Sequence, residues 1–504
     1  MISFALSLIA LIVGYLFYGK FVEHVFGPDD RPTPAVAHPD GVDYIPMPTW
    51  RVYMIQFLNI AGTGPIFGAI MGALYGPAAY YWIVFGCIFA GAMHDYMSGM
   101  LSIRNNGANL PELVGRYLGV NPRRVMIVFS VLLLMMVGVV FVYSPAIILH
   151  KIGGSKIFWV VIIFIYYIIA TLLPIDKIIG KIYPIFAFSL LFMAVALMVG
   201  LFVKMPDIPE FWSNLSSCNH NVPASIFGAD SYIKSSPLFP CLFITIACGA
   251  ISGFHATQSP LMARCINSER KARPVLYGAM ITEGIVALIW ATVSMYFFYY
   301  GGWRECVGNA EVKTFLDQVQ LPGGKTLVQY FDAPSVVTYV CSGWLGIAGG
   351  ILAMLGVVAA PITSGDTAFR SARLIIAEAL HMEQKSVAKR LYIAVPMFVA
   401  AIALLVWQST NPDGFAHIWQ WFGWSNQTLS VFTLWCITVY LVEQKKPYII
   451  SLIPALFMTT VCATFLFVSP MALGLSTQVG YTLGIVVLAI AIVWYTIWFK
   501  RRTK

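Results

Sequence analysis

Long apolar runs with almost no charged residues recur along this chain, and they constrain its fold more than any other feature. Residues 125–149, 157–173 and 479–499 are apolar over about 17 to 25 positions, the length of a helix that crosses a bilayer. Only 11% of the 504 residues are charged, against roughly a quarter in soluble proteins. The sequence therefore predicts an all-α, polytopic membrane protein in a lipid bilayer.

Thirteen segments have the composition of membrane-spanning helices. They are 2–26, 52–75, 77–103, 122–149, 156–174, 180–203, 237–263, 274–301, 335–362, 388–408, 414–442, 448–469 and 476–499. Basic residues gather after the odd-numbered segments from the third onward, whereas the connections 409–413 and 470–475 have neither Lys nor Arg. Because basic loops stay in the cytoplasm, this alternation predicts an N-terminus outside and a cytoplasmic C-terminus. The net charge of +9 thus reflects topology, and no nucleic-acid partner is expected.

Two predicted spans contain helix-breaking residues. The second has Gly-Thr-Gly-Pro at 62–65, and the seventh has glycines, serines and a proline over 249–260. Backbone groups freed at such breaks are tolerated in a bilayer only where they face protein, an ion or a wet cavity. Broken helices in corresponding positions of two repeats are typical of transporter binding sites. Close packing of small residues between helices is the alternative reading.

The breaks lie five spans apart, which predicts two five-helix repeats of opposite orientation. We expect an extra N-terminal helix and loop over 1–51, a first repeat over 52–203 and an extracytoplasmic loop over 204–236. A second repeat over 237–443 is followed by two C-terminal helices and a basic tail over 444–504. The predicted fold is therefore about thirteen helices with a five-plus-five inverted repeat and two discontinuous helices.

Ionisable side chains at membrane depth are costly, at about 2.5–3.5 kcal/mol each, so each needs a reason. The candidates for proton coupling are His94, Asp95, Glu283 and Asp366, and His255 follows the second break. Structural alternatives are open: Asp95 pairs with His94 or Arg104, and Glu283 pairs with a basic residue. The alternative for Asp366 is that it caps a short helix over 364–384. The alternative for His255 is that it only packs against its neighbours.

Other chemistry has weak support in the sequence. The histidines show no paired metal-ligand spacing, and the Gly-Thr-Gly-Pro segment lacks the Gly-Lys-Ser/Thr of a phosphate loop. The longest stretches between spans are about 33 residues, too short for an ATP-hydrolysing domain. We expect no enzyme activity, no metal and no cofactor, so that an ion gradient drives any active transport. Cys218 and Cys306 lie in loops predicted to be outside and are a possible disulfide.

Several segments together resemble the carbon starvation protein A (CstA) family. They are AGTGPIFGA in the second span, GAMHD in the third, GAISGFHATQSPLMARC in the seventh, SGDTAFRSAR after the ninth and FGWSNQ in the eleventh. The resemblance implies a transporter of the bacterial inner membrane, related to the amino acid–polyamine–organocation superfamily. It also implies uptake of peptides or pyruvate, with proton symport in the pyruvate-type members.

In that architecture the substrate lies between the two breaks. Half-helix N-termini attract a carboxylate, which peptides and pyruvate both carry. The expected substrate-binding residues are Gly62, Thr63, Gly64, Ser252, Gly253, His255, Thr257 and Gln258. Hydroxyls at Thr363 and Ser364 are the expected place for a sodium ion, since oxygen ligands suit a hard cation. A proton-coupled importer is the first hypothesis; a sodium symporter and a ligand-binding sensor or channel are the alternatives. The sequence leaves the cargo and the oligomeric state open.

Overall fold

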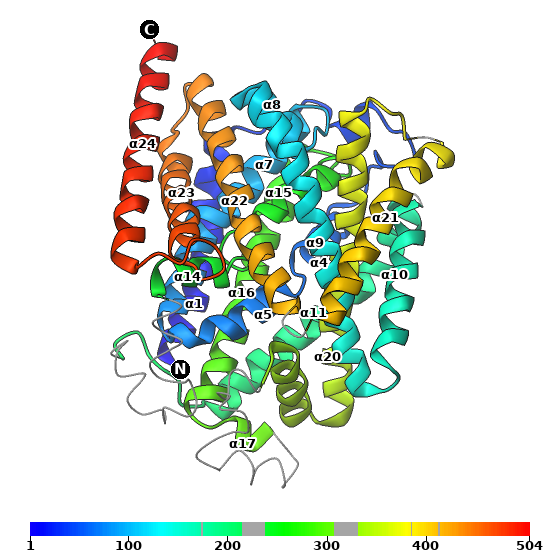
Figure 1. Ribbon diagram of the computed structural model, residues 1–504, viewed down its shortest axis with the longest axis vertical. Helices are drawn as coiled ribbons and strands as arrows, with labels where there is room; N and C mark the ends of the chain where they lie inside the picture. Colours follow the sequence, from blue (N-terminus) through cyan, green and yellow to red (C-terminus); the bar gives the residue numbers. More distant parts are fainter. Residues whose placement is uncertain (173–174, 214–236, 307–330, 385, 412–413, 504) are drawn as a thin grey trace.

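The computed structural model describes residues 1–172, 175–213, 237–306, 331–384, 386–411 and 414–503. Across these ranges the chain is helical and contains no β-strand, so the all-α prediction is confirmed. The helices run mostly side by side, and the two termini lie at opposite ends of the molecule (Figure 1).

The first half of the chain, to residue 204, forms α1 Ile2–Val13, η1 Gly14–Tyr18, α2 Gly19–Phe26, α3 Pro34–Ala37, α4 Thr49–Ile60, α5 Gly64–Gly72, η2 Ala73–Tyr75, α6 Ala78–Tyr81, η3 Trp82–Gly91, α7 Ala92–Arg104, α8 Leu110–Leu118, α9 Val120–Ile152, α10 Lys156–Leu172 and α11 Ile175–Lys204. The second half forms α14 Leu238–Thr245, α15 Gly253–Ala263, η5 Glu269–Lys271, α16 Ala272–Tyr299, α17 Trp303–Cys306, α20 Ala333–Ala379, α21 Val387–Thr410, α22 Gly414–Glu443, α23 Ile449–Val468 and α24 Thr477–Thr503.

Eight of the described helices are long and apolar enough to cross a membrane, and the bent pair α4–α5 makes nine. Helix is present in all thirteen predicted segments, but the number thirteen is not confirmed. Segment 77–103 is divided among α6, η3 and α7, and segment 237–263 is two short helices. α10 is apolar but shorter, at 17 residues.

Large apolar side chains cover the outer faces of several helices. Ile9 on α1, Tyr392 on α21, and Ile485 and Trp494 on α24 are each more than half exposed. Such a surface is unfavourable in water and favourable against lipid tails. The interior packs α9 and α11 against α20, and α16 against α4, α5 and α7.

Ion pairs gather the segments predicted to share the basic side of the membrane. Arg104, at the end of α7, contacts Glu269 through Nε at 3.1 Å and Nη2 at 2.9 Å. Lys446 donates to the carbonyl of Phe26. Arg264 pairs with Glu378 at 3.1 Å. Five stretches distant in sequence, around residues 26, 104, 264–269, 378 and 446, therefore meet at one end of the molecule. Its assignment to the cytoplasm stays a prediction.

The segments predicted to face the other side also meet. The amino group of Met1 pairs with Glu210, just after α11, and Lys204 pairs with Glu305 on α17. Helix ends that the basic residues assign to the same side of the membrane therefore do lie close together. This alternation of sides accounts for why the termini lie at opposite ends (Figure 1).

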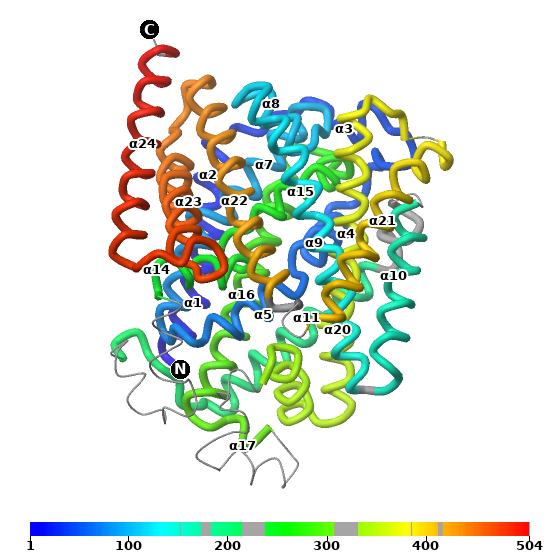
Figure 2. The backbone as a smooth tube through the Cα atoms, viewed as in Figure 1, coloured from blue at the N-terminus to red at the C-terminus, as the bar shows by residue number. Residues whose placement is uncertain are grey.

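Residues 27–48 form a cover over the basic end. Figure 2 shows α3, within this segment, at the same end as α8. The main chain of residues 27–48 is hydrogen-bonded to the residues after α15: Ile45 N donates to Arg264 O and Met47 N to Cys265 O, both at 3.1 Å. Asp43 lies 3.8 Å from Arg370 of α20. The cover therefore joins the ends of two helices that carry predicted site residues.

The segment that leads into α7 is a π-helix of ten residues, η3. Its last residue, Gly91, lies against the second break: a Cβ there would be 2.1 Å from Ala250 O. π-Helical turns are rare and are frequent at functional sites. Here the wide turn is followed within four residues by His94 and Asp95.

We predict that Glu269→Gln destabilises the protein, because Glu269 is fully buried and accepts two hydrogen bonds from Arg104 and one from Asp29 N. Removal of the charge leaves Arg104 with only the half-exposed Asp29, 3.7 Å away, as a counter-ion, at an expected cost of about 2 kcal/mol. The measurement is the midpoint of thermal unfolding of the purified protein in detergent.

The matched control is Asp30→Asn, which breaks the exposed pair between Asp30 and Arg270. Solvent screens that pair, so the midpoint should stay the same. Equal shifts for the two variants would show that the buried pair contributes no more than a surface pair.

Candidate functional site

The first break separates α4 from α5. Helix α4 ends at Ile60, residues 61–63 are not helical, and the axis turns by 45° before α5. Asn59 and Thr63 are fully buried, yet the amide of Asn59 and the hydroxyl of Thr63 have no hydrogen-bond partner among the described residues. Polar groups without partners are costly at this depth, so the first break is a candidate place for a ligand, and the substrate-binding role of Gly62, Thr63 and Gly64 stays a prediction.

The second break separates α14 from α15. It comprises residues 246–252, and Gly249 turns the chain with φ of +91°. A Cβ at Gly249 would lie 2.4 Å from Ala287 Cβ, so both the dihedral angle and the space require glycine. The sequence prediction of two interrupted helices is confirmed here.

The two breaks contact each other. A Cβ on Gly64 would lie 2.4 Å from the sulfur of Cys248, and one on Gly68 would lie 2.8 Å from Thr245 O. The start of α5 therefore packs directly on the chain between α14 and α15. Segments nearly 190 residues apart in sequence, 62–65 and 249–253, come together in the interior.

A chain of buried titratable groups runs beside the second break. His94 Nδ1 lies 2.8 Å from Asp95 Oδ1, and His255 Nδ1 lies 2.8 Å from Asp95 Oδ2. On its other side His255 Nε2 lies 3.4 Å from Glu283 Oε2. All four side chains have no exposed surface. Three of the four predicted proton-coupling residues thus join one predicted substrate-binding residue.

This arrangement shows which groups pair, while the role of these residues in proton coupling stays a prediction. Asp95 pairs with His94 and His255, and the alternative partner Arg104 contacts Glu269 instead. His255 bridges two carboxylates, which a histidine that only packs would not do. The basic partner of Glu283 is this same histidine.

Cys248 completes the cluster and was not singled out from the sequence. Its sulfur, a ring nitrogen of His255 and a carboxylate oxygen of Glu283 lie within 4.8 Å of one another. Histidine pairs at close spacing along the chain reveal only metal ligands that belong to one segment. They could not reveal a site whose ligands come from separate segments. The position of Cys248 next to Gly249, inside the break, was the available signal.

Asn426 of α22 closes the N-terminus of α15. Its Oδ1 accepts from Phe254 N at 2.6 Å and from Ser252 Oγ at 3.1 Å. A helix N-terminus has donors without partners, and a side-chain oxygen from another helix satisfies one of them here. The polar sequence Ser-Asn-Gln in α22 was visible in the sequence, but its partner was not.

Ser364 of α20 lies at the end of α4. Its Oγ is 2.8 Å from Asn59 O, 3.2 Å from Leu58 O and 3.0 Å from Ala360 O. The neighbouring Thr363 bonds back to its own helix, 2.8 Å from Ala360 O. A hydroxyl and three carbonyl oxygens therefore converge at the first break, where the sequence placed a sodium ion. That role for Thr363 and Ser364 stays a prediction.

Asp366 lies apart from the other predicted acids. Tyr183 donates to its Oδ2 at 2.8 Å, and Tyr166 lies 3.4 Å from the same oxygen. The alternative that it caps a separate helix over 364–384 is wrong, because α20 runs without interruption from residue 347 to Ala379, and its role in proton coupling stays a prediction. The Thr-Ser-Gly sequence before it suggested a helix start, but packing against α9 and α11 keeps this stretch helical.

Thr257 and Gln258 lie one turn along α15. The Thr257 hydroxyl donates to Phe254 O at 2.7 Å, and Gln258 Nε2 donates to Thr257 Oγ1 at 2.9 Å. Both are buried, and Gln258 Oε1 has no partner among the described residues. Their part in substrate binding stays a prediction. Of the predicted disulfide, Cys306 is buried at the end of α17, and Cys218 lies outside the described residues.

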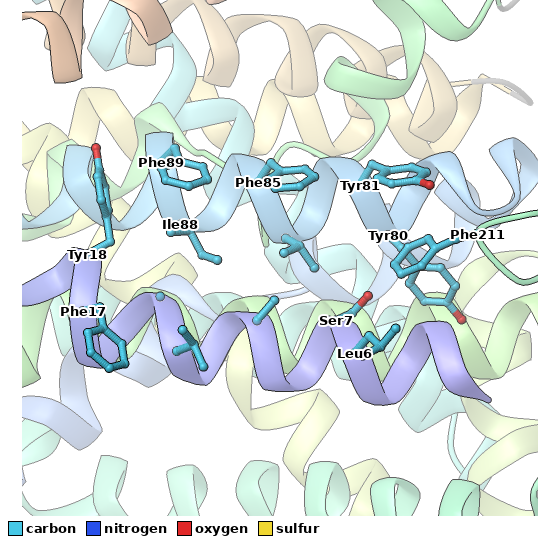
Figure 3. A pocket seen from close by; sticks show the side chains of 14 residues that line it. Leu6, Ser7, Phe17, Tyr18, Tyr80, Tyr81, Phe85, Ile88, Phe89 and Phe211 are labelled. Atoms are coloured by element: carbon cyan, nitrogen blue, oxygen red, sulfur yellow. The ribbon is translucent and has the colours of Figure 1, made fainter.

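A groove of about 430 Å³ lies elsewhere, between α1 and η3 (Figure 3). Figure 3 shows Leu6, Phe17 and Tyr18 facing Phe85 and Phe89 across it. Its fourteen lining residues include no charged side chain. Because no charged side chain lines it, the groove offers a small carboxylate no counter-ion, and the pair of breaks stays the candidate site.

Comparison with known proteins connects these features to a family. The profile described as carbon starvation protein CstA matches residues 1–146, 141–312 and 338–465. An uncharacterised membrane protein of Haemophilus influenzae is 46% identical over 340 residues, which are 59% of this chain and 91% of that protein. The peptide transporter CstA of Bacillus subtilis is 27% identical, over 90% of this chain and 87% of that protein. The pyruvate/proton symporter BtsT of Escherichia coli is 28% identical, over 56% and 47% respectively.

Solved structures share the fold. A manganese transporter of Eremococcus coleocola aligns with a TM-score of 0.52 at 13% identity, over 93% of this chain and 99% of that one. MhsT, solved in complex with L-phenylalanine, aligns with a TM-score of 0.53 at 12% identity, over 87% and 98%. At these identities the likeness concerns the arrangement of helices alone.

We predict that Asn426→Ala lowers the thermal stability of the protein, because it leaves Phe254 N buried without an acceptor. The expected cost is about 1–3 kcal/mol. Asn426→Asp keeps an oxygen at the same place and should lose less. The midpoint of unfolding in detergent measures both, with Asn411→Ala at the exposed end of α21 as the surface control. An unchanged midpoint for Asn426→Ala would mean that this contact does not hold α15.

Proposed function

The chain belongs to the carbon starvation protein CstA family, and we propose that it is a secondary active importer of small peptides or pyruvate, driven by a proton gradient. Its membrane is the inner membrane of a bacterium, with the N-terminus outside and the C-terminus in the cytoplasm. The family match and the names of its relatives support a transporter rather than an enzyme. The observation that carries the proton coupling is His255, held between Asp95 and Glu283.

An imidazole between two carboxylates suits proton transfer. Histidine exchanges a proton near neutral pH, and each of its two nitrogens faces an acid here. In a membrane interior such groups are too costly to be retained without a role. Because Asp95 is on α7, His255 on α15 and Glu283 on α16, a change in the helix arrangement also changes which acid the imidazole contacts.

Substrate recognition follows from the two half-helices. The N-termini of α5 and α15 carry the positive ends of their helix dipoles, which attract a carboxylate, although Asn426 already accepts from Phe254 N in α15. Thr63 lies directly before the first, and its hydroxyl has no partner among the described residues. We therefore propose that the carboxylate of the cargo binds between residues 62–64 and 252–253, with Thr257 and Gln258 lining the path.

The two breaks also support the proposed inverted repeat. Each occurs in the first helix of its five-helix repeat, over 52–203 and 237–443, and each packs against the other. Two equivalent half-helices that meet in the centre are what a transporter needs to open alternately to either side. A ligand-binding sensor or channel of the same fold would bind the cargo without concentrating it.

We predict that His255→Gln abolishes accumulation. In proteoliposomes with an alkaline interior, the wild type should concentrate labelled pyruvate or a labelled dipeptide, and the variant should lose roughly 100-fold in rate. Glutamine keeps a similar volume and polarity but carries no proton. His381→Gln, at an exposed position after α20, is the matched control and should transport as the wild type does.

Three results would each change the proposal. Normal uptake by His255→Gln removes this residue from the coupling. Uptake that requires sodium in place of the pH gradient favours the sodium symporter, for which the oxygens around Ser364 are the specific support. Binding without accumulation under either gradient favours the sensor or channel.

We predict that a free carboxylate is required for recognition. A dipeptide with an amidated C-terminus and the methyl ester of pyruvate both lack the anion that the half-helix N-termini attract. Neither should compete with the labelled cargo, whereas the parent acids should. Competition assays in the same proteoliposomes measure this, and equal competition by the ester or amide would contradict the proposed binding mode.

A further inference from the structure

We propose that Cys248, His255 and Glu283 form a binding site for one divalent transition-metal ion of the zinc class. They come from three places: the second break, α15 and α16. Their donor atoms lie within 4.8 Å of one another, and all three side chains are buried. The set offers one sulfur, one imidazole nitrogen and one carboxylate oxygen to a common centre.

The distance between His255 and Glu283 fits two ligands of one ion. Their Nε2 and Oε2 atoms are 3.4 Å apart. A charge-assisted hydrogen bond is shorter, at about 2.7–2.9 Å. Two tetrahedral ligands at about 2.0–2.2 Å from a zinc ion are about 3.4 Å from each other. Gly249 N–H approaches Glu283, but neither carboxylate oxygen nor His255 Nε2 has a hydrogen bond of good geometry.

The groups around the ligands suit a metal site as well. Asp95 Oδ2 lies 2.8 Å from His255 Nδ1, which fixes the tautomer that leaves Nε2 free to coordinate. Asp95 is itself held by His94 at 2.8 Å. A carboxylate behind a coordinating histidine is the usual support of a zinc ligand, because it orients the ring and makes it more basic.

The donor set selects the class of ion. Thiolate and imidazole favour zinc and its neighbours over magnesium and calcium, which prefer oxygen. A thiolate and a carboxylate together balance the charge of a divalent ion, which a buried site requires. From a separation of at most 4.8 Å, the sulfur needs to move by no more than about 1.2 Å to reach the ligand spacing of about 3.6 Å. Asn426 Nδ2 lies 3.7 Å from the Cys248 sulfur, close enough to support a thiolate there.

The test is titration of the full-length protein, purified in detergent and stripped with a chelator, with Co²⁺ as a spectroscopic probe and then with Zn²⁺. We expect one Co²⁺ per chain, with the charge-transfer absorption of a cobalt–thiolate bond, and its loss when Zn²⁺ displaces the cobalt. Cys248→Ser should lack this absorption. Cys436→Ser, which removes another buried cysteine on α22, should retain it.

A second variant separates binding from misfolding. Asp95→Asn keeps all three ligands but weakens the support of His255, and should weaken Zn²⁺ binding by roughly 10–100-fold while the cobalt–thiolate absorption remains. The proposal is overturned if the wild type shows no cobalt–thiolate absorption, or if Cys248→Ser keeps it. The unfolding midpoint of each variant shows that it is folded.

One consequence rests on the proposed function. A metal bound to His255 prevents the imidazole from carrying a proton, so micromolar Zn²⁺ should inhibit proton-driven uptake by the wild type. Cys248→Ser should be inhibited less, relative to its own rate without zinc. Equal inhibition of both would overturn the link to this site. The optical titration needs no transport, so a failure of the proposed function and a failure of the metal site remain distinguishable.

Discussion

Two helices are interrupted in the buried interior, and every polar main-chain group at these breaks needs a partner from the protein, from water or from a ligand. The contacts around the site follow from this requirement. Asn426 supplies an acceptor for the start of α15, and Ser364 lies against carbonyls at the end of α4. Gly64 and Gly68 let the two breaks approach each other closely, and Gly249 lets the second break pack against α16. The groups that lack partners among the described residues, such as those of Asn59 and Thr63, make the first break the candidate place for a ligand.

The same interior explains why the titratable side chains form a connected chain. Burial of a single carboxylate without a partner would cost too much free energy. Asp95 contacts the imidazoles of both His94 and His255, and the imidazole of His255 also contacts Glu283. Each group thereby lowers the cost of burying its neighbour. The cluster lies beside the second break, where the chain is not helical. A change in conformation there alters the contacts of these side chains most.

Much of this was accessible from the sequence because it depends on local chemistry. Apolar length predicts helices, Gly and Pro predict their breaks, and basic residues predict which helix ends lie together. Pairings across the fold were less accessible. Arg104 selects Glu269 and Asp95 selects His255 because of packing between helices distant in sequence. The continuous α20 around Asp366 also escaped prediction, since neighbouring helices override a local signal for a helix start. Cys248 has no distinguishing sequence context apart from its glycine neighbour.

The π-helix η3 has a consequence for the orientation of the helix that follows it. A π-turn holds an extra residue compared with an α-turn, and the wide turn absorbs that residue. If Trp82–Gly91 were wound as an α-helix with no residue removed, each extra residue would rotate α7 by about 100°. Asp95 would then turn away from His255, and no substitution at either position would restore their contact. The winding of this stretch therefore determines the chemistry of the site as firmly as the identity of the acid itself.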